Sequence, residues 1–161
     1  DHIRARVVAV IQEQLRQVGI VVDVVPLDPN ALFQRFSEAN YDSIYFGIQA
    51  SATDPALNAS FWFSSGVWHV WNPAQKTPAN DWERRIEDLM TRNATSPDQA
   101  ERVRLFTEVQ KIFVDEMPGI YFVTPKVTLA VSSRVRNPQP APQLPQLLWS
   151  ADTLAAAPPA R

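Results

Sequence analysis

The strongest constraint on the fold of this chain is an alternation of helical and strand-like patterns over its first 48 residues. Apolar residues recur at the spacing of an amphipathic helix over 3–18, at Ile3, Val7, Val10, Ile11, Leu15 and Val18. Gly19 stands where helices commonly end in a left-handed residue, and the β-branched run 20–25 is typical of a short buried strand. Asp28-Pro29 begins a short helix, and 42–48 is predicted as a second strand. A strand, a helix and a further strand form a crossover unit, which favours an α/β fold with parallel pairing.

Two longer helices are predicted in the middle of the chain. One begins near Asp81 and presents one apolar face, formed by Trp82, Ile86, Leu89 and Met90. The other follows the capping-box pattern Ser96-Pro97-Asp98-Gln99 and stops at Pro118-Gly119. We expect its inward residues to be Val103, Phe106, Val109, Ile112 and Phe113. Strands are predicted over 120–123 and 127–131, and the Pro-rich run 137–145 is expected to be an extended surface segment.

Composition excludes several classes of protein. The 161 residues correspond to about one domain. Fifteen Lys and Arg against seventeen Asp and Glu give a net charge of −2, which argues against a nucleic-acid partner. Cys is absent, so disulfide scaffolds, thiol nucleophiles and thiolate metal sites are excluded. Apolar runs are far shorter than the roughly 18 residues that a membrane span needs, and no secretion signal opens the chain.

Recognisable catalytic and metal-binding patterns are absent from the sequence. It lacks paired histidines at metal-ligand spacing, calcium loops and Gly-rich nucleotide loops, so we predict no metal and no cofactor. Ser64 or Ser65 together with His69 could form a nucleophile and its base, but Ser64-Ser65-Gly66 lacks the strand–turn–helix setting of a nucleophile elbow. We therefore predict no catalytic residues, with a small hydrolase that uses this trio as the alternative.

The least ordinary feature of the sequence is an aromatic stretch over 61–71. It contains Phe61, Trp62, Phe63, Trp68 and Trp71. Such residues either contact a planar or apolar ligand or anchor a long loop to the core, and both roles are open for different members. Trp82 and Trp149 are isolated and are predicted to be structural, whereas Asp54 is predicted to cap a helical turn rather than to hold a ligand.

Several segments, taken in order, resemble the C-terminal part of bacterial extracellular solute-binding proteins of family 5, the peptide, nickel and oligosaccharide receptors of ABC importers. The resemblance covers about residues 3–135 and is carried by 11–22, 41–47, 54–55, 71–73, 86–90, 101–102, 109–112 and 118–121. It implies the C-terminal lobe of a type II periplasmic-binding-protein fold, with a mixed sheet flanked by helices. Residues 1–135 form this partial lobe, and residues 136–161 form a Pro-rich return segment and tail.

The same resemblance implies a two-lobed receptor that closes on its solute like a hinge. Because the first helix has no strand before it, we expect the chain to begin inside a domain. The resemblance further implies that an N-terminal lobe and a lipoprotein or secretion signal are missing. The implied location is periplasmic or otherwise extracytoplasmic. The implied partners are a small-molecule or peptide-like solute, the permease subunits and the missing lobe. No enzymatic activity is expected, and a protein-interaction module with an exposed aromatic patch is a further alternative.

In the family, the end of the strand that matches 43–48 reaches the ligand cleft, in agreement with the rule that ligands of open α/β sheets lie beyond the carboxyl ends of strands. The ligand-binding residues predicted here are Gly47, Ile48, Gln49, Ala50, Ser51, Asp54, Trp68 and Trp71. Peptide-binding relatives carry an acidic residue near the position of Ser51, which pairs with the peptide ammonium. Since a buried ammonium needs a counter-charge, either the ligand is not a free peptide amine or another acid such as Asp54 replaces it.

Overall fold

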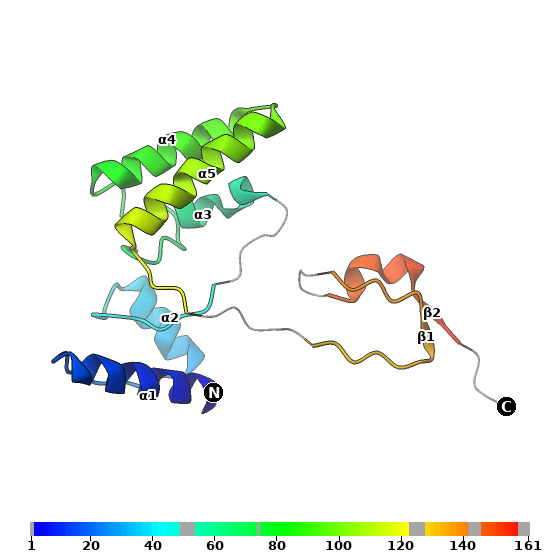
Figure 1. The fold of residues 1–161 in the computed structure, drawn as a ribbon, viewed down its shortest axis with the longest axis horizontal. Helices are drawn as coiled ribbons and strands as arrows, with labels where there is room; N and C mark the ends of the chain where they lie inside the picture. The colour runs from blue at the N-terminus through cyan, green and yellow to red at the C-terminus, as the bar shows by residue number, and fades with distance from the viewer. Residues whose placement is uncertain (1, 49–53, 74, 123–127, 142–145, 158–161) are drawn as a thin grey trace.

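The computed structural model describes residues 2–48, 54–73, 75–122, 128–141 and 146–157, and the structural statements below concern these residues. In chain order the helices are α1 (His2–Gln17), α2 (Pro29–Ser37), the 3-10 turn η1 (Pro55–Asn58), α3 (Ala59–Trp62), α4 (Asp81–Thr95) and α5 (Gln99–Glu116). They are followed by β1 (Val135–Arg136), the 3-10 helix η2 (Leu148–Thr153) and β2 (Ala155–Ala156). In Figure 1, α4 and α5 lie side by side above α3, α2 and α1, whereas β1, η2 and β2 stand apart from the helices.

The predicted helices form close to their expected positions because their termini carry strong caps. The Asp28 carboxylate accepts hydrogen bonds from the backbone N–H groups of Asn30 and Ala31 at the start of α2. Asn80 caps α4 in the same way, through the N–H of Glu83. Gly19, just after α1, has a φ of +83°, which confirms the left-handed position expected there.

The start of α5 differs from the expected capping box by two residues. Asp98, and not Ser96, is the N-cap, and its carboxylate accepts from the N–H of Ala100 at 2.9 Å. Ser96 instead donates its hydroxyl to Glu101 at 2.8 Å. The helix ends at Glu116, and Met117 leaves it in a left-handed conformation with a φ of +43° immediately before Pro118.

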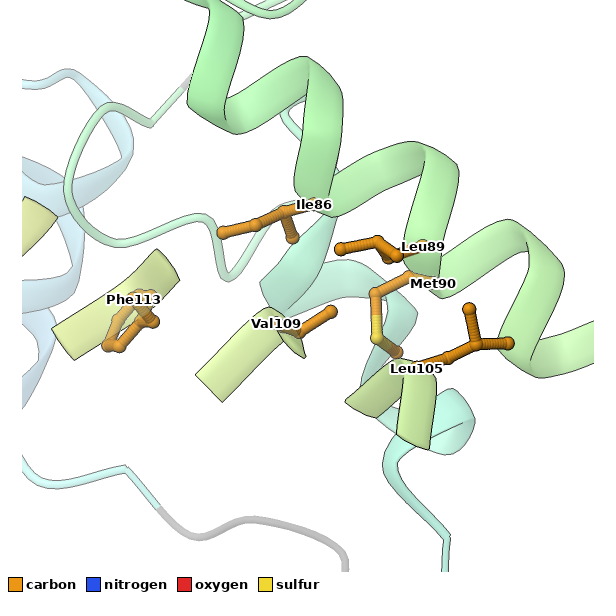
Figure 2. Packing of buried hydrophobic residues seen from close by; sticks show 6 residues of the cluster. All are labelled: Ile86, Leu89, Met90, Leu105, Val109 and Phe113. Carbon is orange, nitrogen blue, oxygen red and sulfur yellow. The ribbon is translucent and has the colours of Figure 1, made fainter. Parts of the chain in front are cut away.

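The buried core lies between α4 and α5. Figure 2 shows the six side chains that make it: Ile86, Leu89, Met90, Leu105, Val109 and Phe113. The prediction for the inner face of α4 is therefore confirmed, but the prediction for α5 is partly wrong. Val103 is 57% exposed, and Leu105, which was not predicted, is buried. The apolar pattern of α5 is wide enough to fit two registers, and only the position of α4 selects one of them.

The predicted strands do not form in the described residues. The runs 20–25, 42–48, 120–122 and 128–131 pair with no neighbouring strand; residues 123–127 lie outside the described part of the chain. The sheet among the described residues is the short antiparallel pair β1–β2, with Val135 opposite Ala156. A strand needs a partner for its backbone groups, and Val21 in the first run is 85% exposed. The expectation of a partial type II lobe with a mixed sheet stays a prediction, as do its boundaries at 135 and 136.

The core makes a direct prediction, because α5 carries one buried and one exposed valine. Val109→Ala removes two methyl groups at a fully buried position and is expected to lower the free energy of unfolding by about 2 kcal/mol. The same change at Val103 is expected to leave stability within about 0.5 kcal/mol. Urea unfolding followed by circular dichroism measures both, and equal effects would contradict the register of α5.

Candidate functional site

The aromatic stretch 61–71 divides into two groups that face different parts of the protein. Phe61, Trp62, Phe63 and Trp71 pack against the α4–α5 core. Trp62 meets Phe106 and Phe113 edge-on, with ring centroids 5.6 and 5.5 Å apart. These residues anchor the loop to the core, whereas Trp68 points to another set of rings. The anchoring role left open by the sequence therefore fits Phe61, Trp62, Phe63 and Trp71, and the ligand-contact role stays a prediction.

Trp68 belongs to a four-ring cluster, formed with Phe33, Phe36 and Phe46, that we call the α2 ring cluster. The Trp68 ring centroid lies 6.0–6.1 Å from each of the other three. Phe36 is buried at the centre and stacks on Phe46 with an interplanar angle of 6°. Tyr41 stacks on Phe36 and donates its hydroxyl to the carbonyl of Val70, which ties the aromatic loop to this cluster.

A cleft of about 590 Å³ lies between the α2 ring cluster and the rings that cover the core. One side is formed by Phe46, Gly47, Ile48 and Trp68, and the other by Asn58, Ser60, Phe61, Trp62 and Tyr121. Phe113 of the core backs this second side, because its ring contacts those of Phe61, Trp62 and Tyr121. Packed rings therefore support Phe46, Phe61 and Trp62, whereas Trp68 and Tyr121 are 38% and 71% exposed.

The structure brings only some of the predicted ligand-binding residues to this cleft. Gly47, Ile48 and Trp68 line it. Trp71 is packed between Phe61 and Trp82 in the core, away from the lining. Gln49, Ala50 and Ser51 lie outside the described residues.

Other lining residues were missed by sequence reasoning. Phe61 and Trp62 carried a usable signal, since they belong to the aromatic stretch. No sequence signal pointed to Tyr121 as a lining residue. It follows α4 and α5 in the chain, and only the tertiary fold places it at the cleft.

Asp54 acts as the predicted cap and lies beside a second, smaller cavity of about 200 Å³. Its carboxylate accepts from the N–H of Ala56 and pairs with the guanidinium of Arg102. The pKa of Asp54 is lowered, first by the Ala56 N–H and then by Arg102. An acid committed to these partners is not placed to receive an ammonium in the aromatic cleft.

The Ser–His arrangement of the hydrolase alternative does not form. The hydroxyl of Ser64 donates to the carboxylate of Glu87. His69 is fully buried, with Nδ1 3.2 Å from the carbonyl oxygen of Phe61 and Nε2 3.4 Å from Oε1 of Glu83. Both ring nitrogens thus face partners other than a serine, and His69 is part of the loop's packing.

Glu83 is the centre of a buried polar network that holds the aromatic loop on α4. Its carboxylate, 2% exposed, accepts from Trp71 Nε1 at 2.9 Å, from Gln75 at 3.2 Å and from the Ala79 N–H at 2.7 Å. Burial raises the pKa of Glu83, but these donors and His69 together outweigh it, so the pKa is lowered. The ionised carboxylate is therefore the form that the fold stabilises.

The described residues contain neither a metal-binding group of side chains nor a membrane-spanning helix. Their His, Asp and Glu side chains form no group of three or more that could hold a metal ion. None of the helices described here is long and apolar enough to cross a membrane.

Comparison with known proteins gives one significant similarity. The chain is 26% identical over 129 residues to the probable D,D-dipeptide-binding periplasmic protein of Escherichia coli (strain K12). The matched region is 78% of this chain, and the chain spans 24% of the length of this relative. No family model and no solved structure matches the chain. The similarity supports a relationship to solute-binding proteins; membership of family 5 in particular stays a prediction.

The Glu83 network predicts a pH-dependent loss of stability. Glu83→Gln places an NH2 group against donors and is expected to cost about 1–3 kcal/mol at pH 7. Because the folded-state pKa lies below the ordinary value of 4.5, this contribution is full above pH 4.5 and is lost as the pH falls through the lowered pKa. The difference between the parent chain and the variant should therefore shrink below pH 4.5 in urea melts. Glu108→Gln, which removes an exposed pair with Arg85, is the control and should have little effect.

Gly66 predicts a strict size limit in the aromatic loop. A Cβ there would lie 2.1 Å from the carbonyl oxygen of Ser60, a backbone atom that also accepts the N–H of Trp68. Gly66→Ala is expected to cost about 1–3 kcal/mol, because the loop must move off α3. Gly119→Ala, where a Cβ meets nothing within 4 Å, is the matched control in thermal unfolding. Equal melting temperatures for the two variants would contradict this account.

Proposed function

We propose that this chain is part of an extracytoplasmic solute-binding receptor of an ABC importer. The observation that carries the proposal is the similarity over 129 residues to a protein named as a periplasmic dipeptide-binding protein. On this proposal the protein captures a small or peptide-like solute outside the cytoplasmic membrane and delivers it to permease subunits. It has no catalytic role.

We place the solute in the aromatic cleft. The volume of about 590 Å³ lies within the range of ~300–1,000 Å³ that is usual for small-molecule sites. Several of its rings contact the α2 ring cluster or Phe113, which lowers the conformational entropy that those rings lose when a ligand enters. Asn58 and Ser60 supply polar groups in an otherwise apolar lining.

The relative's name provides the first solutes to test. Solute-observed NMR with D-alanyl-D-alanine, L-dipeptides and their end-blocked forms is expected to show binding by at least one class. Trp68→Ala removes a large ring from the wall and should weaken that binding about tenfold or more.

Trp149→Ala is the matched control, since Trp149 lies outside the cleft lining, and should leave the affinity unchanged. Circular dichroism shows whether both variants are folded. Absence of binding by every class, or equal affinity in the parent chain and folded Trp68→Ala, would overturn the proposal.

A further inference from the structure

The lining of the aromatic cleft carries no charged side chain among the described residues. Its polar side chains are Asn58, Ser60 and the phenol of Tyr121, and the rest is aromatic or aliphatic apart from Gly47. A ligand group that enters here meets neutral surfaces.

Acids that are close in sequence to the cleft walls do not belong to the lining. Asp42, before Phe46, and Glu116, before Tyr121, are not lining residues, and Asp54, before Asn58, is held by Ala56 and Arg102. One cation comes close, because Arg4 Nη2 lies 3.6 Å from the point that a Cβ on Gly47 would occupy. Arg4 is outside the cleft lining.

These observations decide which ligand groups the cleft favours. An ammonium or carboxylate that leaves water for this lining loses hydration without gaining an opposite charge, which weakens its binding. An apolar ring gains free energy from the surface that it buries and finds aromatic walls with which it can stack or meet edge-on. Ser60 supplies a hydroxyl that can pair with a neutral amide or hydroxyl at its end.

We infer that the cleft selects an uncharged apolar or aromatic group of its solute and discriminates against ammonium and carboxylate groups. This inference rests on the proposed function and adds the chemical class of the ligand. The part of the solute that enters the cleft is neutral, whatever charges the rest of the solute bears.

The test uses four compounds that differ only in the side chain: the N-acetylated, C-amidated forms of phenylalanine, leucine, lysine and glutamate. Solute-observed NMR with the full chain measures each affinity. The phenylalanine and leucine compounds are expected to bind at least tenfold more tightly than the lysine and glutamate compounds. The inference would be overturned if the lysine or glutamate compound bound at least as tightly as the phenylalanine compound and lost this binding in Trp68→Ala. That result would leave the proposed function standing. Absence of binding by these compounds and by the dipeptides would overturn both.

The same inference can be tested by changing the protein instead of the ligand, with a substitution that introduces a charge. Ile48 lines the cleft and is 45% exposed, so Ile48→Asp places a carboxylate in the wall at little cost to the fold. The variant is expected to bind the lysine compound at least tenfold more tightly than the parent chain does, and the phenylalanine compound more weakly. Val67→Asp, at a position 73% exposed and outside the lining, is the matched control and should keep the parent preference. An unchanged preference in folded Ile48→Asp would contradict the inference.

Discussion

The packing of α4 against α5 is the interaction on which the rest of this structure depends. Its buried side chains form the core, and the anchoring part of the aromatic stretch packs directly on it. Phe113 links the core to the cleft, because it belongs to the core and also contacts the lining residues Phe61, Trp62 and Tyr121. One wall of the cleft is therefore an extension of the core. Disruption of the packing between α4 and α5 would therefore remove that wall even if every lining residue were kept.

The other wall is supported by the four rings of the α2 ring cluster, with Phe36 at its centre. That cluster joins α2, the segment before Gln49 and the aromatic loop, and the Tyr41–Val70 hydrogen bond holds the loop to it. Glu83 fixes the same loop on α4 through donors from Trp71, Gln75 and Ala79. The loop is thus attached on both sides, and Trp68 lies at the cleft because its neighbours are committed elsewhere. This explains why two tryptophans three positions apart differ in role.

Local sequence signals predicted the helices well, since a helix cap or a left-handed terminal residue interacts only with residues close to it in the chain. Asp28, Asn80 and Gly19 are examples. Strand predictions failed for the run 20–25, because a strand requires a partner and the described residues supply none there. Of the predicted ligand-binding residues, Gly47, Ile48 and Trp68 line the cleft, whereas Asp54 and Trp71 have other partners; their role in binding a ligand stays a prediction.

By itself, the sequence determined the positions of α1, α2, α4 and α5, apart from the N-cap of α5, and the absence of thiol chemistry. Side-chain spacing and most helix caps depend only on residues that are close in the chain. The tertiary structure alone decided that Leu105 and not Val103 faces α4, that His69 binds Glu83 rather than a serine, and that Tyr121 lines the same cleft as Trp68. Each of these depends on which distant surfaces meet. Side-chain periodicity shows that a face is apolar, but it does not show what covers that face.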